Sequence, residues 1–205
     1  NYSRKNKKNK NKIINIKLPF FFPNYILNKY FIKIFNSLYY HFFSFKKKGT
    51  KTIDFYNFFF PLDKILNWNK LYGKSGFLQY QFVLPKRNSL EGIKKIIKII
   101  TESNQISPLA VLKLLGPKNK NYLSFPMEGY TLAVDFKFNK NLFSLLDKID
   151  IVVQKLGGRI YLAKDARMQS QIFKSSYPDL SKFEIYRKNS RLNDKFNSDQ
   201  SKRLG

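Results

Sequence analysis

The clearest pattern of apolar and polar positions lies in residues 77–85. The even positions of this segment are all apolar: Leu78, Tyr80, Phe82 and Leu84. The odd positions include Gln79 and Gln81. A period of two is that of a β-strand with one buried face. We therefore expect a strand that presents two neighbouring glutamines, close enough to hold one ligand, on the face away from the core. A plain solvent-facing strand is the alternative.

Similar patterns predict two helices and three further strands. The helices are expected at 88–103, with Asn88 and Glu91 resembling a capping box, and at 141–156. The stripe expected to be buried in the first is Leu90, Ile93, Ile97 and Ile100; in the second it is Leu142, Leu145, Leu146, Ile149, Val153 and Leu156. The strands are expected at 109–116, 130–138 and 159–163.

The resulting order is strand, helix, strand, strand, helix, strand. This order predicts an α+β fold of the ferredoxin-like split pattern, an antiparallel sheet with helices on one face. The helix-free face would then gather Gln79, Gln81, Lys113, Thr131 and Ala133, with Lys164 at the end of a neighbouring strand. A polar, cationic floor of this kind is a candidate pocket. Lys113 alone has a second interpretation, as a charge that protects an edge strand from pairing.

Charged residues are crowded into the segment 157–167, Gly-Gly-Arg-Ile-Tyr-Leu-Ala-Lys-Asp-Ala-Arg. The double glycine can end a helix in the left-handed conformation. Lys164, Asp165 and Arg167 follow the expected strand, where a rigid sheet can fix side chains of a functional site. The spacing is also compatible with a solvated turn that carries a surface ion pair, either Lys164–Asp165 or Asp165–Arg167.

The first third of the chain is basic and aromatic. Residues 1–12 are predicted to be a disordered linker, 13–51 a connecting segment, and 52–205 the main domain. Leu27, Tyr30, Ile34 and Leu38 predict an amphipathic helix after Pro23, which either packs on its own domain or rests on a membrane surface. Further expectations are a strand at 52–60, a short helix at 62–71 with Trp68 in the core and Gly73 as its stop, and short helices over 168–204 that wrap the sheet.

The amino-acid composition limits the kinds of partner and site that we expect, but it does not identify the function. The net charge of +26 suggests a nucleic acid or an anionic membrane, but Lys, Asn, Ile, Phe and Tyr are also the residues that an AT-rich genome favours. Nucleic acid is the less favoured partner. Cysteine is absent and His41 is the single histidine, so we expect no thiol chemistry and no metal site. No signal pattern or transmembrane run occurs in the sequence.

Several motifs, in order, resemble one family: Phe-Pro-Leu-Asp (60–63), Gly-Phe-Leu-Gln-Tyr-Gln-Phe-Val-Leu-Pro (76–85), Lys-Leu-Leu-Gly-Pro (113–117), Gly-Tyr-Thr-Leu-Ala-Val-Asp-Phe (129–136), the segment 157–167, and Ser-Asp-Gln-Ser-Lys-Arg-Leu (198–204). They are similar to the C-terminal half of the decaprenylphosphoryl-β-D-ribose oxidase family. Its members are FAD-dependent oxidoreductases of the vanillyl-alcohol-oxidase class, related to D-arabinono-1,4-lactone oxidase.

The resemblance implies a substrate-binding, or cap, domain that covers the flavin of a two-domain enzyme. It implies that Lys164 is catalytic, that Lys164 and Tyr161 lie near the cofactor, and that the substrate pocket is lined by Gln79, Gln81, Lys113, Thr131, Ala133, Tyr161 and Phe59. Phe59 stands where the family often has tyrosine, so a pocket hydroxyl is expected to be missing. FAD would be bound mainly by a domain that this chain lacks, which makes the chain a C-terminal fragment.

The activity implied by the resemblance is oxidation of a sugar hydroxyl, with a polyprenyl-phosphate-linked pentose as substrate; the alternatives are an aldonolactone oxidase and, in another class, a basic nucleic-acid-binding module. The partners implied are the sugar or lipid-linked sugar, an FAD-binding domain, and a reductase that completes an epimerisation in cell-wall synthesis. The location expected is the cytoplasm or the periphery of the inner membrane.

Overall fold

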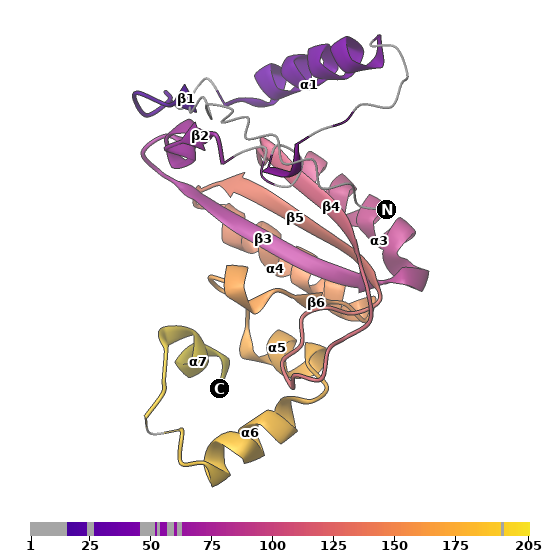
Figure 1. Ribbon diagram of the computed structural model, residues 1–205, viewed down its shortest axis with the longest axis vertical. Helices are drawn as coiled ribbons and strands as arrows, with labels where there is room; N and C mark the ends of the chain where they lie inside the picture. Colours follow the sequence, from indigo (N-terminus) through magenta and orange to yellow (C-terminus); the bar gives the residue numbers. More distant parts are fainter. Residues whose placement is uncertain are drawn as a thin grey trace, which may run out of the picture.

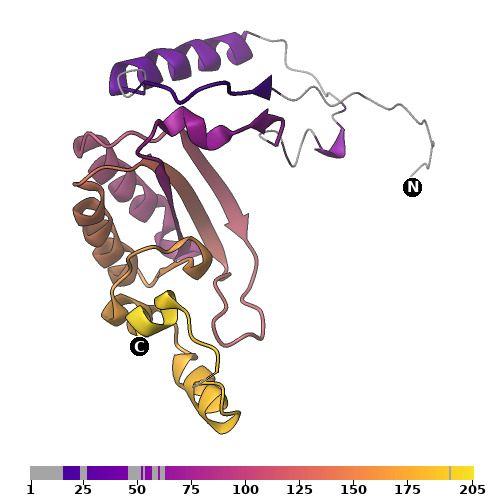
Figure 2. The ribbon, with the colours of Figure 1, turned by 90° about the vertical axis from the view of Figure 1, so that its left-hand side faces the viewer.

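The sheet predicted from the sequence is the centre of the fold. The computed structural model describes residues 16–23, 27–45, 52, 54–56, 60, 63–193 and 195–205 (Figure 1). Four strands, β3 (Phe77–Pro85), β4 (Leu109–Leu115), β5 (Gly129–Lys137) and β6 (Arg159–Ile160), form an antiparallel sheet in the order β4-β5-β3-β6. Helices α3 (Lys86–Glu102) and α4 (Leu142–Lys155) cover one face (Figure 2). The predicted α+β, ferredoxin-like arrangement is confirmed.

The core lies between the sheet and these two helices. Tyr80, Phe82 and Leu84 of β3 are buried there, beside Leu132, Val134 and Phe136 of β5. Helix α4 contributes Leu142, Leu145, Leu146, Ile149 and Val153, as its periodicity predicts. Because side chains alternate along a strand, the odd positions of β3 are forced onto the helix-free face.

The buried stripe of α3 differs from the predicted one. Leu90 is 68% exposed and Ile97 49% exposed, whereas Ser89, Gly92 and Ile96 are buried. Gly92 is the reason, because a Cβ at this position would overlap the side chain of Leu84. Small residues thus let α3 approach the sheet closely, and the larger apolar residues on either side of this contact turn outward. Ile93 and Ile100 of the predicted stripe do pack against the core.

The predicted capping box at the start of α3 is also wrong. The helix begins two residues earlier, directly after Pro85. The Asn88 side chain is inside the helix and donates a hydrogen bond to the carbonyl oxygen of Leu156, 2.9 Å away. Glu91 instead pairs with Lys94 on the surface. Asn88 therefore connects α3 to the end of α4 rather than capping its own helix.

The glycine pair ends α4 as predicted, but the strand after it is short. Gly157 adopts a positive φ of 73°. Only Arg159 and Ile160 pair with β3, and the chain then turns into a 3-10 helix, η2 (Leu162–Lys164). The predicted strand at 159–163 therefore stops after two residues. The turn raises Lys164 over the helix-free face of the sheet instead of leaving it beyond a strand end.

The segment before β3 contains structure that the pattern did not predict. Strands β1 (Ile16–Lys17) and β2 (Ile65–Leu66) pair in parallel where part of the helix at 62–71 was predicted. That helix is only a short 3-10 helix, η1 (Trp68–Tyr72), which ends at Gly73 as predicted. Tyr72, fully buried, is the core residue here, and Trp68 packs edge-on against it. The described residues of 52–60 show no strand, with Phe55 and Tyr56 in a helical turn. The rest of that predicted strand, including Phe59, lies outside the described residues.

Helix α1 (Lys29–Ser44) forms where an amphipathic helix was predicted, but none of its residues is buried. Of the stripe predicted to pack on its own domain, Leu27, just before the helix, is buried, whereas Tyr30, Ile34 and Leu38 are exposed, so the interpretation is wrong for the helix itself. Within the described residues, no helix is long and apolar enough to cross a membrane.

The C-terminal segment packs partly on the sheet. Helices α5 (Ser170–Ser176) and α7 (Asp199–Leu204) bury Ile172, Phe173 and Leu204 in the core, which confirms that this part wraps the domain. Helix α6 (Leu180–Asn189) instead lies at the end of the molecule opposite α1 (Figures 1 and 2).

Candidate active site

The helix-free face of the sheet carries three rows of facing side chains. The pairing of the strands sets Gln81 beside Ala133 and Val111, and Gln79 beside Asp135 and Leu109. The third row pairs Thr131 with Lys113. This register brings together the polar residues of three strands that are far apart in the sequence.

A small cavity of about 90 Å³ lies on this face. It is lined by Gln79, Gln81, Leu109, Val111, Lys113, Thr131, Ala133, Asp135 and Lys164. Six of the residues predicted from the sequence to belong to one site therefore do lie around one cavity. Their roles in binding and catalysis remain predictions.

Two predicted site residues are not among those that line the cavity. The ring of Tyr161 packs against Phe125, with the ring centroids 4.5 Å apart, while its backbone N–H donates to the carbonyl oxygen of Gln81 at 2.8 Å. Tyr161 thus fixes the chain next to the cavity. Phe59 lies outside the described residues, so its predicted contact with substrate stays a prediction.

Asp135 lines the cavity although the sequence analysis did not single it out as a site residue. Its carboxylate is buried and accepts hydrogen bonds from Gln79 Nε2 at 2.8 Å and from Tyr72 Oη at 3.0 Å. Burial, and then the charge of Asp135, raise the pKa of Tyr72 well above its ordinary value. Tyr72 therefore stays a hydrogen-bond donor, and the pair holds the Gln79 amide in one orientation. The alternation of β5 already put Asp135 on this face and could have identified it.

Gln81 is held by a chain of two hydrogen bonds. Its Nε2 donates to Thr131 Oγ1 at 3.0 Å, and that hydroxyl donates to the carbonyl oxygen of Phe82 at 2.7 Å. Thr131 is buried and has its donor fully used. No described residue donates to the side-chain oxygen of Gln81, so this oxygen can accept a hydrogen bond from a ligand hydroxyl.

The two lysines of the cavity have no anionic partner among the described residues. Lys113 comes from the edge strand β4 and Lys164 from η2, and neither side chain takes part in the ion pairs or side-chain hydrogen bonds found among the described residues. The proposed surface pair of Lys164 with Asp165 is therefore wrong. Two ammonium groups beside polar amides make the cavity suited to an anionic or hydroxyl-rich ligand.

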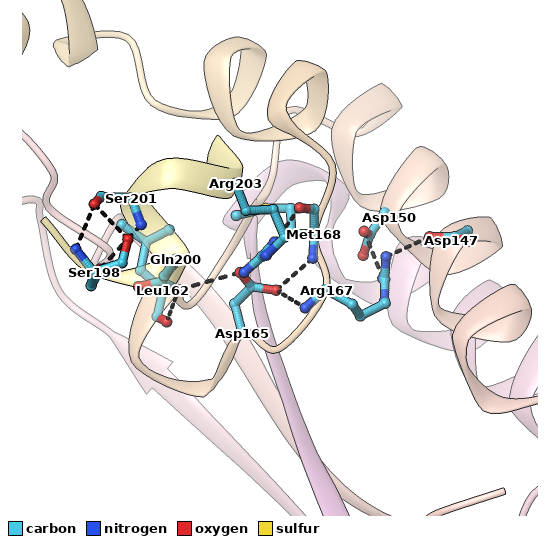
Figure 3. A network of polar contacts seen from close by, with 10 residues as sticks. All are labelled: Asp147, Asp150, Leu162, Asp165, Arg167, Met168, Ser198, Gln200, Ser201 and Arg203. Atoms are coloured by element: carbon cyan, nitrogen blue, oxygen red, sulfur yellow. Dashed lines mark hydrogen bonds and ion pairs between the residues drawn. The ribbon is translucent and has the colours of Figure 1, made fainter. Parts of the chain in front are cut away.

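Asp165, next to Lys164 in the chain, anchors the η2 turn to the C-terminal helix (Figure 3). Its side chain is only 3% exposed, and it accepts from Arg203 Nη2 at 2.7 Å and from the backbone N–H groups of Met168 and Arg167. Gln200 of the same helix donates to the carbonyl oxygen of Leu162 at 2.7 Å. Burial alone would raise the pKa of Asp165, but these hydrogen bonds, led by that from Arg203, outweigh it and lower the pKa.

Arg167 forms a second buried network that reaches α4 (Figure 3). It donates to Asp150 at 2.6 Å and to Asp147 at 2.5 Å, and Tyr80 Oη donates to Asp150 at 2.7 Å. Burial raises the pKa of Asp150 to about 6, although Arg167 and Tyr80 act in the opposite direction. The charged residues of the turn thus differ in their contacts: Asp165 and Arg167 hold the turn in place, and Lys164 lines the cavity.

Two known proteins are similar to this chain in sequence. Decaprenylphosphoryl-beta-D-ribose oxidase of Mycolicibacterium smegmatis is 38% identical over 190 residues, which are 91% of this chain and 40% of the oxidase. The chain resembles this oxidase. An uncharacterised protein encoded 5′ of mprA in Streptomyces coelicolor is 29% identical over 114 residues, 55% of this chain and 31% of that protein. No protein-family model matches. The chain thus spans less than half the length of either relative.

Proposed function

We propose that this chain is the substrate-binding part of an FAD-dependent oxidoreductase that oxidises the hydroxyl of a polyprenyl-phosphate-linked pentose. The observation that carries the proposal is the 38% identity to the ribose oxidase over 91% of the chain. The cavity on the helix-free face supports it, because two glutamines and two unpaired lysines are suited to a sugar with an anionic substituent.

The residues around the cavity also fit a flavin. When bound, the flavin ring would accept the hydride from the carbinol carbon. Lys164 is the group that this chain would offer to the ring, and Tyr161, whose carbonyl oxygen accepts from the Lys164 backbone N–H at 3.1 Å, would support it. Most contacts of FAD would come from a flavin-binding portion on the same polypeptide or on another. The fit rests on the unpaired Lys164 ammonium, which lines a partly enclosed cavity with no carboxylate bound to it in the described part of the chain.

Each cavity residue then has a physical task. The ammonium of Lys164 would stabilise the negative charge that the hydride brings to the flavin ring, while the hydroxyl proton would pass to solvent. A preorganised charge of this kind is usually the largest catalytic term. The amide of Gln81 orients a sugar hydroxyl, and Gln79, held by Asp135, presents a second polar contact. Lys113, on the edge strand at the cavity rim, binds the phosphate that links sugar to lipid.

The proposed product is a keto sugar that is still attached to its lipid. A reductase that returns hydride to the other face of the carbonyl would complete an epimerisation, and such a reductase is the partner we propose for this enzyme in cell-wall synthesis. An enzyme that acts on a lipid-linked substrate would be located in the cytoplasm or at the periphery of the inner membrane.

The test is anaerobic reduction of flavin in the protein that includes its flavin-binding portion. We expect reduction by a prenyl-phosphoryl ribose and none by D-arabinono-1,4-lactone. Reduction by the lactone alone would favour the aldonolactone oxidase instead. A preparation that retains no flavin but binds DNA or RNA with an affinity that falls steeply with salt would replace the enzyme by a nucleic-acid-binding module.

A further inference from the structure

Helix α1 presents an apolar face that the rest of the described chain does not cover. Phe31, Ile34, Phe35 and Leu38 recur at three- and four-residue spacing, so they share one side of the helix. They are 47%, 61%, 54% and 66% exposed. Phe31, Phe35 and Tyr39 stack along this side with ring centroids 6.5 and 6.2 Å apart. Such a row of exposed apolar side chains marks an interaction surface.

The opposite side of α1 carries the polar residues of the helix together with Tyr40, and its only charges are positive. Lys29, Lys33, Asn36 and Ser37 follow the same helical spacing on that side, and the helix contains no Asp or Glu. The helix is firmly started: Asn28 accepts hydrogen bonds from the backbone N–H groups of Tyr30 and Phe31, each at 2.9 Å. Lys29 Nζ donates to Asn104 Oδ1 at 3.3 Å, which fastens this end of α1 to the end of α3.

We propose that α1 is an interfacial helix that binds the surface of an anionic lipid bilayer. Aromatic and aliphatic side chains on one side and lysines on the other are the arrangement of helices that lie in the headgroup region. Charge complementarity selects this partner, because a chain with a net charge of +26 repels a second copy of itself and is attracted to anionic lipid. This inference does not depend on the proposed reaction.

The placement of α1 agrees with such a contact. It lies at the end of the molecule, beyond β1 and β2, while α6 lies at the other end (Figures 1 and 2). A bilayer that meets α1 therefore leaves α5, α6 and α7 away from the lipid. The buried residue Leu27, just before the helix, anchors it to the protein.

The experiment is vesicle flotation of the chain at low and high salt. We expect it to float with vesicles of phosphatidylcholine and phosphatidylglycerol in a 7:3 ratio (about one anionic lipid in three). It should float much less with phosphatidylcholine alone, and binding should weaken in about 1 M salt, where the screening length is about 3 Å. Equal recovery in the lipid-free fraction with both vesicle types would overturn the proposal.

Substitutions distinguish binding through the apolar face of α1 from binding through the positive charge of the whole chain. Leu38→Gln should weaken binding by about tenfold, and the triple change Ile34→Gln, Phe35→Gln, Leu38→Gln by at least about a hundredfold, because Gln keeps helix propensity while removing apolar burial. The matched control is Tyr40→Gln, on the polar side and 69% exposed, which should bind like the wild type. Circular dichroism checks that the helix remains.

A triple variant that floats as well as the wild type would overturn the proposal, since charge alone would then explain the binding. So would a wild-type chain that ignores vesicles but forms a dimer that the triple variant loses, because α1 would then contact a second copy. The role of charge is tested with two double variants. Lys29→Gln with Lys33→Gln removes both lysines of α1, and Lys74→Gln with Lys140→Gln removes two exposed lysines elsewhere. The first variant should need a higher vesicle concentration for half-maximal flotation than the second. Equal effects of the two pairs would contradict a contact through α1.

Discussion

The contact between Asp165 and Arg203 should hold in place the turn that carries Lys164. Asp165 is 3% exposed and loses its hydrogen bonds to Arg203, to two backbone N–H groups and to Gln200 when it is replaced by Ala. We expect Asp165→Ala to lower the free energy of unfolding by about 3–5 kcal/mol, the usual cost of breaking a buried ion pair. Arg203→Met, which removes only one partner of Asp165, should cost about 1.5–3 kcal/mol.

A double-mutant cycle measures how strongly the two side chains depend on each other. Urea unfolding followed by circular dichroism, on the wild type, both single variants and the double variant, should give a coupling of about 1.5–3 kcal/mol. The exposed pair Lys94–Glu91 is the control, with a coupling of about 0–1 kcal/mol. Additive effects at Asp165 and Arg203, like those at the control pair, would refute the idea that α7 holds the turn.

The coupling should also depend on pH in a defined direction. The pKa of Asp165 is lower in the folded protein than in the unfolded chain, so its contribution is present above the unfolded pKa of about 3.9 and is lost as the pH falls through the folded value. The cycle repeated near pH 3 should therefore give a smaller coupling than at pH 7. An unchanged coupling would show that the carboxylate charge is not what Arg203 recognises.

Two further predictions concern the core. Gly129→Ala should lower the free energy of unfolding by more than about 3 kcal/mol, because its Cβ would overlap the backbone carbonyl of Leu84 across the sheet; a change below about 1 kcal/mol in urea unfolding would contradict this. The side chain of Asp150 should titrate near pH 6 by carbon-detected NMR, and since the unfolded chain loses that proton near pH 4, its contribution to stability should fall as the pH rises from about 4 to 6. A midpoint below 4 would mean that Arg167 outweighs burial.

Strand alternation was enough to predict the sheet and most of the cavity. Once Tyr80 and Phe82 are assigned to the core, Gln79 and Gln81 must lie on the other face, and the split topology brings Lys113 and Thr131 beside them. Lys164 could be associated with the site through its place after the last strand, although the turn that lifts it is a 3-10 helix rather than a strand end.

The errors arose where packing depends on contacts distant in the sequence. The pattern of α3 favoured large apolar residues such as Leu90, but its contact with the sheet is made through Gly92, whose lack of a side chain has no signal in hydrophobicity. The role of Asp165 could not be seen either, because its partner Arg203 lies 38 residues later. The apolar face of α1 had a correct periodicity, yet periodicity cannot tell what covers a helix.

The catalytic role of Lys164 is the central claim, and anaerobic stopped-flow reduction of the flavin-loaded enzyme by prenyl-phosphoryl ribose tests it most directly. Lys164→Ala should leave the fold and flavin content unchanged, since the side chain is outside the core and has no partner among the described residues, but should slow reduction by at least about a hundredfold. Gln81→Ala, from the same cavity, should mainly weaken substrate binding, by about 0.5–1.5 kcal/mol. A folded, flavin-loaded Lys164→Ala enzyme that is reduced at the wild-type rate would contradict the account.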